Sequence, residues 1–293
     1  LAQLLRALGI SSARIPEGVD ELAGLYRRQL TRRRVLIVLD NAADEGQVRP
    51  LLPGGGSSAV LITSRALLAG LDTATTIRLD VLNEDESLDL LSKLVGGARV
   101  DADPEAAKAI SRLCGYLPLA VRIAGAKLNA NPQLPLTHFA QQLVDHRRRL
   151  DTLQVGDLDL RASFALSYQQ LPADQQRLFR LLGLQEGPSI GVPAARALLN
   201  QQATKDEHQK AEDLLDQLVV LNLLENPMLS RYRLHDLLRL FAHEQAISVE
   251  PEPERIMALQ RLFTFYLATT QRADQRIRPG RPLDGKLAES PQQ

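Results

Sequence analysis

The feature of this sequence that most constrains its fold is the apolar run Val35–Leu39, which Asp40 and Asn41 follow directly. The run is rich in β-branched residues and shows no alternation of apolar and polar positions, which is typical of a parallel-sheet strand that is buried on both faces. Open α/β sheets bind their ligands beyond the carboxyl ends of their strands. We therefore expect Asp40 either to organise Mg²⁺ beside bound phosphates or, more simply, to bound the turn after the strand.

Two more segments extend this pattern. Ala59–Arg65 is an apolar run that ends in polar residues and is the second expected strand. Thr75–Leu79 contains β-branched residues and is the third. Apolar residues at helical spacing predict helices before, between and after these strands, so residues 1–100 have the order of a parallel α/β fold. Arg65 ends the second strand, and its planar, permanently charged guanidinium can either contact a terminal phosphate or cover the sheet edge.

The glycine run Gly54–Gly56 invites comparison with a phosphate-binding loop, and the comparison fails. Such a loop needs a Lys-Ser or Lys-Thr pair after its glycines and then a helix, whereas this run has no lysine and leads into a strand. The motif G-x-x-x-x-G-K-S/T is absent from all 293 residues. The sequence therefore supplies candidate side chains for a phosphate site but not the loop.

Helical patterns dominate downstream of the strands. Asn83 with Glu86 three positions later forms a capping-box pattern before one helix. Asp103 and Pro104 predict the start of another, since proline is favoured in the first turn. We interpret residues 101–156 as a small helical domain.

Residues 157–250 combine several helices with two short extended segments, at about 223–226 and 231–234, which indicates a winged-helix domain. Winged helices commonly bind DNA, yet the helix in the recognition position, Lys205–Leu221, contains five acidic residues against two lysines. Acidic side chains would face the DNA phosphates. We therefore expect no direct nucleic-acid binding, with a DNA-binding winged-helix regulator as the alternative. An amphipathic helix and a Pro- and Gln-rich tail complete the chain over 251–293.

Composition excludes several classes of protein. Formal net charge is zero, so no global field attracts nucleic acid or an acidic membrane. The single cysteine, Cys114, excludes an intramolecular disulfide and a cysteine-based zinc cluster. No apolar run reaches the roughly 18 residues of a membrane span, and the chain begins without a signal-peptide pattern. We expect a cytoplasmic protein that does not contact membranes.

Four strings in chain order carry a resemblance to a known family: Val35–Asn41, Val60–Arg65, Cys114–Ala120 and Tyr232–Leu237. They resemble, in turn, the Walker B strand, the sensor strand ending in Thr-Ser-Arg, the Gly-Leu-Pro-Leu motif and the Met-His-Asp motif of the NB-ARC branch of the STAND signal-transduction ATPases. The resemblance is greatest to the actinobacterial transcriptional regulators of the SARP type. Tyr116 stands where glycine is usual, and Leu234 stands where methionine is usual. The resemblance implies an α/β plus all-α protein, with an incomplete parallel P-loop NTPase sheet, a small helical domain and a winged-helix domain.

The resemblance also implies roles for four residues. Asp40 is then the catalytic carboxylate and organises Mg²⁺ indirectly, and Arg65 senses the γ-phosphate. Pro118 packs on adenine, and His235 reaches the β-phosphate of bound ADP and holds the winged-helix domain closed. An imidazole can donate to a phosphate, and a proline ring is a rigid apolar face for a base. Without the resemblance, Pro118 marks only a helix start and His235 only a helix N-terminus.

Two departures from the family pattern qualify these roles. The P-loop and its strand are missing, and we expect them to precede Leu1 in a longer parent protein; a degenerate relative is the alternative. Asn41 replaces the second acid that many relatives carry, which weakens the case for a general base. We expect the parent to be a slow ATPase that binds ADP or ATP with Mg²⁺, and this chain by itself to be inactive.

The sequence as a whole predicts a nucleotide-operated regulatory switch module of a bacterial signalling or transcriptional regulator. Self-association on activation is the expected response. A nucleotide-independent scaffold for protein interactions is the second alternative, in which the sheet and helices only present surfaces.

Overall fold

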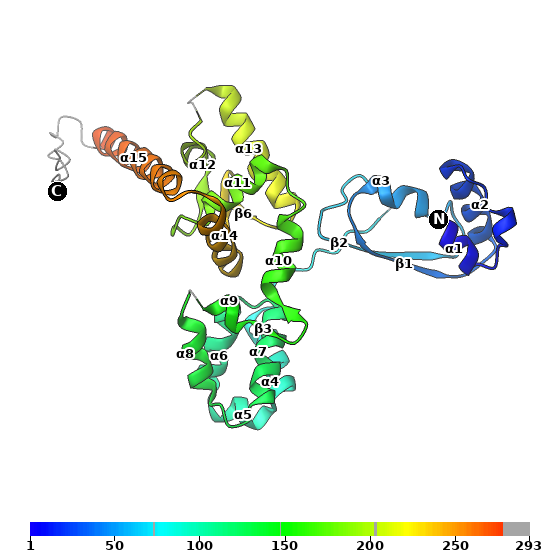
Figure 1. Ribbon diagram of the computed structural model, residues 1–293, viewed down its shortest axis with the longest axis horizontal. Helices are drawn as coiled ribbons and strands as arrows, with labels where there is room; N and C mark the ends of the chain where they lie inside the picture. The colour runs from blue at the N-terminus through cyan, green and yellow to red at the C-terminus, as the bar shows by residue number, and fades with distance from the viewer. Residues whose placement is uncertain (73, 147, 202–203, 278–293) are drawn as a thin grey trace. The chain divides into compact units, whose positions relative to one another are not determined.

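The computed structural model describes residues 1–72, 74–146, 148–201 and 204–277, and Figure 1 labels its elements. Contacts divide the chain into two compact units. The first comprises Leu1–Leu79 with Val220–Asn222, and the second comprises Asp80–Val219 with the chain from Leu223 onward. The fold is mixed, with many helices and small parallel and antiparallel sheets, which confirms the expected combination of α/β and all-α parts at this level.

The first unit is built on a parallel pair of strands. Its elements are α1 (Ala2–Ala7), the 3₁₀ turn η1 (Ser12–Arg14), α2 (Val19–Thr31), β1 (Leu36–Ala42), α3 (Glu45–Val48), the 3₁₀ turn η2 (Arg49–Leu51) and β2 (Ala59–Ser64). Leu36 lies opposite Ala59 and Leu39 opposite Ile62, and the register shifts between Leu39 and Ala42. The first two strands predicted from apolar runs are therefore confirmed.

One face of this strand pair packs against helices. Ile37 points into a buried group that includes Tyr26 of α2, whose apolar residues recur at helical spacing. A smaller group lies at the end of β1. The two buried clusters comprise Leu5, Tyr26, Leu30 and Ile37, and Ala42, Val48 and Leu71.

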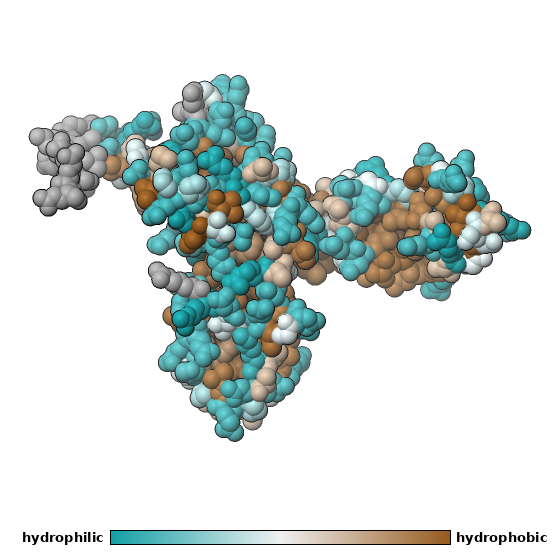
Figure 2. All heavy atoms as spheres, in the orientation of Figure 1, coloured by the Kyte–Doolittle hydropathy of each residue, from teal (hydrophilic) through white to brown (hydrophobic). Residues whose placement is uncertain are grey.

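The opposite face of the strand pair is open, which corrects the prediction that the strand is buried on both faces. Leu36, Val38 and Leu61 are 66%, 57% and 54% exposed. Figure 2 shows a brown, apolar area over the part of the chain that carries the two strands. The unbroken apolar run indicated cover on both sides, but no described element of the first unit packs on this face.

The prediction of a third strand at Thr75–Leu79 is wrong. The segment has no regular secondary structure, and Ile77 and Leu79 are 79% and 89% exposed. A strand needs a neighbour for its backbone N–H and C=O groups. Within the described residues β2 pairs with β1 alone. Thr75–Leu79 therefore has no strand to pair with, and its β-branched residues do not form one.

The second unit begins with a group of helices. They are α4 (Glu84–Val95), α5 (Gly97–Ala102), α6 (Pro104–Leu113), α7 (Pro118–Ala130), α8 (Leu136–Val144) and α9 (Arg149–Thr152). Asn83 and Glu86 form the expected capping box, and Pro104 opens α6 as predicted. Because α4 packs against α6 and α7, it belongs to this group, and the predicted domain boundary at residue 100 lies within α5.

A short antiparallel pair, β3 (Gln154–Val155) and β4 (Leu158–Asp159), leads into the rest of the chain. The remaining elements are α10 (Leu160–Tyr168), α11 (Ala173–Leu182), β5 (Ile190–Gly191), α12 (Val192–Leu198), α13 (Lys205–Val220), β6 (Glu225–Met228), β7 (Arg231–Arg233), α14 (Asp236–Val249) and α15 (Glu252–Ile277). β6 and β7 form the expected hairpin, and β5 adds a third antiparallel strand in the order β5-β7-β6.

An aromatic cluster anchors α14 within the second unit. The ring centre of Phe241 lies 5.9 Å from those of Phe164 and Tyr168 and 6.2 Å from that of Phe179. Tilted and edge-on aromatic contacts of this kind are favourable. The cluster fixes the helix that begins directly after His235.

Candidate functional site

Asp40 lies near the carboxyl end of β1. The Thr63 hydroxyl of β2 donates a hydrogen bond to Asp40 Oδ1 over 2.5 Å, and Thr63 Oγ1 in turn accepts one from the Asn41 backbone N–H over 2.8 Å. Asn41 has φ +54°, a left-handed conformation that Asn adopts more readily than most residues. The exposed Asp40 carboxylate is therefore held in a defined direction by the neighbouring strand.

Arg65 follows β2 at the same edge of the sheet, because parallel strands end on the same side. Ser64 pairs with Ala42 in register, and its hydroxyl donates to the Ala42 carbonyl over 2.8 Å. The Arg65 carbonyl accepts a hydrogen bond from Asn222 Nδ2 over 2.7 Å. The first unit thus brings Asp40 and Arg65 to one edge.

The turn between α6 and α7 carries Pro118. Gly115 and Tyr116 both have left-handed backbones, with φ of +60° and +57°. Their N–H groups donate to the carbonyls of Arg112 and Ser111 and so close the end of α6. Pro118 then opens α7 with its ring exposed, so the turn presents a rigid apolar surface to solvent.

His235 contacts this turn from a distant part of the sequence. It is the N-cap of α14, where Nδ1 accepts a hydrogen bond from the Leu237 backbone N–H over 3.3 Å. Its Nε2 lies 2.9 Å from the Gly115 carbonyl oxygen, although the two residues are 120 positions apart. The second unit thus brings His235 to the turn that carries Pro118.

A buried guanidinium influences both sides of this contact. Arg149 of α9 is 5% exposed, and its Nε donates to the Leu143 carbonyl at the end of α8 over 2.6 Å. Burial lowers the pKa of Arg149, and the charge of Asp236 opposes that shift. Burial also raises the pKa of the Cys114 thiol to about 12, partly opposed by the positive charge of Arg149. A positive charge is therefore buried close to both the turn and the start of α14.

The four predicted residues thus lie at two places. Asp40 and Arg65 lie at one sheet edge of the first unit, and Pro118 and His235 lie at the turn between α6 and α7 in the second. That all four converge on one cleft stays a prediction. Sequence reasoning assigned no role to Thr63, which orients Asp40. It also assigned none to Gly115, the partner of His235, although a glycine between a helix end and a proline is a local signal for a special backbone conformation.

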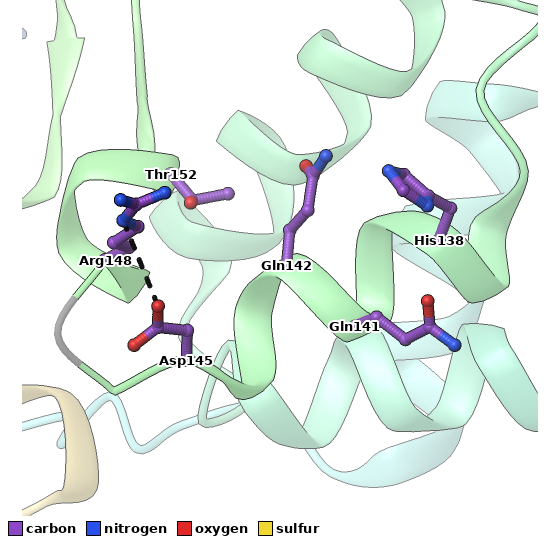
Figure 3. A pocket seen from close by; sticks show the side chains of 6 residues that line it. All are labelled: His138, Gln141, Gln142, Asp145, Arg148 and Thr152. Atoms are coloured by element: carbon purple, nitrogen blue, oxygen red, sulfur yellow. Dashed lines mark ion pairs between the residues drawn. The ribbon is translucent and has the colours of Figure 1, made fainter.

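A separate hollow of about 420 Å³ lies beside α8 and α9 (Figure 3). Six residues with polar side chains line it: His138, Gln141, Gln142, Asp145, Arg148 and Thr152. Arg148 Nε and Asp145 Oδ2 form an ion pair there at 4.0 Å. None of the four predicted site residues lines this hollow.

Two kinds of feature are absent from the described residues. Between residues 1 and 277, leaving out the undescribed positions 73, 147, 202 and 203, no three or more His, Cys, Asp or Glu side chains gather in a way that suits a metal ion. Within the same part of the chain, no helix combines the length and apolar character that crossing a membrane requires.

The chain is similar to segments of longer regulatory proteins. Regulatory protein AfsR of Streptomyces griseus is 48% identical over 286 residues, and that of Streptomyces coelicolor is 46% identical over 290 residues. Each comparison covers 97% of this chain and 29% of the relative. Disease resistance protein RML1A of Arabidopsis thaliana is 24% identical over 248 residues, which is 80% of this chain and 23% of that protein. No protein-family model matches.

Proposed function

We propose that this chain is a nucleotide-operated switch module of a bacterial signalling or transcriptional regulator, with ADP or ATP as its ligand. The observation that carries the proposal is the 2.9 Å contact between His235 Nε2 and the Gly115 carbonyl. It joins the string similar to the Met-His-Asp motif to the string similar to the Gly-Leu-Pro-Leu motif. In this proposal residues 1–79 of the first unit are part of a P-loop NTPase domain, and residues 157–250 are a winged-helix domain.

The geometry of the second unit suits the roles proposed for its two residues. The exposed ring of Pro118 offers adenine a flat apolar surface at the start of α7. The imidazole of His235 offers a ring N–H to a phosphate oxygen. His235 also stands at the N-terminus of the 14-residue helix α14, where the helix dipole favours a negative charge.

In the first unit, Asp40 and Arg65 supply opposite charges at one edge of the sheet. Mg²⁺ in phosphate sites prefers oxygen ligands and is bound through one or two carboxylates together with substrate phosphates. Asp40 fits this chemistry, because its carboxylate is exposed and Thr63 orients it. Arg65 is the proposed contact for a terminal phosphate, and Mg²⁺, when bound, would neutralise part of the phosphate charge.

Hydrolysis is not part of the proposal for these 293 residues. They contain no G-x-x-x-x-G-K-S/T motif, and phosphoryl transfer depends on such a loop to position and neutralise the phosphates. A parent protein with the loop would hydrolyse ATP slowly, since Asn41 stands where a second acid would act as a base. Exchange of nucleotide would then set the state of the switch, and self-association would follow activation.

Regulation is the proposed purpose of the switch. Two of the relatives are named regulatory proteins, and a more distant relative is named a disease resistance protein. Because the chain spans 29% of the length of the AfsR proteins, we assign to it only the nucleotide-dependent step.

The test is nuclear magnetic resonance of the isotope-labelled chain during titration with ADP. Without the phosphate loop we expect a dissociation constant on the order of 1 mM, with shifts concentrated at Gly115, Tyr116 and the His235 ring. Pro118→Ala should weaken binding by about 5- to 10-fold through lost apolar contact. Pro104→Ala, which changes the equivalent position of α6, should leave binding unchanged.

Two outcomes would contradict the proposal. One is the absence of shifts at Gly115, Tyr116 and His235 when ADP is present in large excess over the expected dissociation constant. The other is an equal effect of the Pro118 and Pro104 substitutions, which would place the binding site away from the turn.

A further inference from the structure

The His235 ring makes two hydrogen bonds that together determine where its hydrogen lies. The Leu237 backbone N–H can only donate, so Nδ1, 3.3 Å away, accepts and carries no hydrogen. The Gly115 carbonyl oxygen can only accept, so Nε2, 2.9 Å away, carries the hydrogen and donates it. The two backbone groups thus select one neutral tautomer.

The His235 ring also leaves no room for a side chain at position 115. A Cβ added at Gly115 would lie 2.2 Å from His235 Cε1 and 2.6 Å from Nε2, so the imidazole would have to move. The left-handed φ of +60° is a second reason for glycine. Because the imidazole is rigid, moving Nε2 away from Gly115 also disturbs the bond between Nδ1 and Leu237.

We propose that Gly115 is the positioning residue for His235. Its carbonyl and its missing side chain hold the imidazole with the hydrogen on Nε2, directed at the turn that carries Pro118. The inference deepens the proposed function and rests on it for the identity of the ligand. A phosphate oxygen that uses this hydrogen has to approach at the Gly115–Tyr116 turn, where it shares the N–H with the Gly115 carbonyl.

The first test is spectroscopic and uses the unmodified chain. Nitrogen-15 spectra of the histidine rings at about pH 8 distinguish protonated from unprotonated ring nitrogens, and the His235→Gln variant identifies the signals of His235. We expect a protonated Nε2 and an unprotonated Nδ1, without averaging between tautomers. An averaged or reversed pattern would overturn the inference.

The second test is a double-mutant cycle measured by denaturant unfolding. Gly156→Ala is the matched control, because Gly156 has φ +57° and an added Cβ would meet nothing within 4 Å. It should lower the folding equilibrium constant through backbone strain alone, by roughly 5- to 30-fold. Gly115→Ala should lower it by about a further tenfold, because the new methyl group collides with the ring.

The informative comparison is the effect of Gly115→Ala in the His235→Ala background. There the methyl group of Gly115→Ala occupies space that the imidazole has left, so the extra penalty should vanish and only the strain seen in Gly156→Ala should remain. Equal penalties with and without His235 would show that the ring and Gly115 are not coupled.

Conservative variants of His235 separate its two hydrogen bonds. Gln can place an amide N–H near the position of Nε2, whereas Asn can place its side-chain oxygen near the position of Nδ1. We expect His235→Gln, and not His235→Asn, to keep the extra penalty of Gly115→Ala. If His235 served only as a helix cap, Asn would be the better replacement, since it is a preferred N-cap residue.

None of these measurements uses nucleotide, so the two proposals can fail separately. If ADP does not bind while the tautomer and the cycle agree with expectation, the nucleotide function is wrong and the positioning role of Gly115 stands. If ADP binds while Nε2 carries no hydrogen, the positioning role is wrong and nucleotide binding stands.

Discussion

Arg180 and Glu250 form an ion pair within the second unit, with 2.6 Å between Arg180 Nη2 and Glu250 Oε1 and side chains only 10% and 8% exposed. Arg180 also donates to the Tyr168 hydroxyl over 2.6 Å. Glu250 is the C-cap of α14 and is followed directly by Pro251 and α15. The pair therefore ties the junction of the last two helices to α11.

Removing one partner of this pair should destabilise the second unit strongly. Glu250→Leu leaves a buried guanidinium without its counter-charge, which typically costs about 3–5 kcal/mol. Adding Arg180→Met should recover part of the loss, because no charge then remains unpaired. Urea unfolding measures both changes. Asp89→Ala, which breaks the exposed Lys93–Asp89 pair, is the control and should change the free energy of unfolding by less than about 1 kcal/mol.

Two substitutions of glycine by alanine should have opposite effects on stability. At Gly183 an added Cβ would lie 2.5 Å from the backbone of Ala242 and His243, so α11 and α14 would have to separate, at a cost of about 1–3 kcal/mol. At Gly24, inside α2, the Cβ would meet only the flexible end of Arg28 at 3.6 Å. There alanine should stabilise the helix by up to about 1 kcal/mol. Calorimetry measures both, and a Gly183→Ala protein as stable as the parent would contradict the packing of α11 on α14.

The Cys114 thiol should report on the turn beside it. Burial raises its pKa to about 12, and the thiolate is the reactive form. At about pH 8 a disulfide reagent should therefore label the native chain far more slowly than the unfolded chain. His235→Ala should accelerate labelling by loosening the turn, whereas Gly156→Ala should not. Rapid labelling of the native chain would show that Cys114 is not buried as described.

The same pKa shift predicts how stability depends on pH. The pKa of the folded thiol lies above that of the unfolded thiol, which is about 8.5. The contribution to stability is therefore complete below about pH 8.5 and is lost as the pH rises toward 12, because the unfolded chain ionises first. Urea unfolding should show a decline of up to about 1.4 kcal/mol per pH unit in this range, and Cys114→Ala should make the decline shallower.

DNA binding by the chain should be negligible. Helix α13 would be the recognition helix of a DNA-binding winged helix, and it carries five acidic residues against two lysines. Contacts to phosphates make specific DNA binding strongly dependent on salt. Fluorescence anisotropy with duplex DNA should show no saturable binding at low salt. A sub-micromolar, salt-sensitive affinity would instead favour a DNA-binding regulator.

The sequence predicted those parts of the fold that have local causes. The capping box of Asn83 and Glu86 marks the start of α4, and Pro104 and Pro118 stand at the first positions of α6 and α7. Caps and prolines act within a single helical turn, so their effects can be inferred from neighbouring residues. Strands depend on distant partners. Ile190 of β5 becomes a strand residue only through pairing with Tyr232.

The same distinction applies to the candidate site. The resemblance to a known family pointed to Pro118 and His235. The hydrogen bond between His235 and Gly115, however, spans 120 positions, and no local pattern encodes it. The bond from Thr63 to Asp40 likewise depends on the register of β1 against β2. Both contacts depend on the tertiary structure, so neighbouring residues in the sequence do not predict them.

The open face of the strand pair in the first unit has a practical consequence for work with the purified chain. Environment-sensitive dyes fluoresce when they bind accessible apolar surface, and Leu36, Val38 and Leu61 offer such surface before any heating. A dye-based thermal melt should therefore start from a high baseline and lose contrast when the core becomes exposed. Replacing Val38 by Thr and Leu61 by Gln should lower that baseline without touching the buried side of the sheet. For the unmodified chain, calorimetry is the more faithful measure of melting.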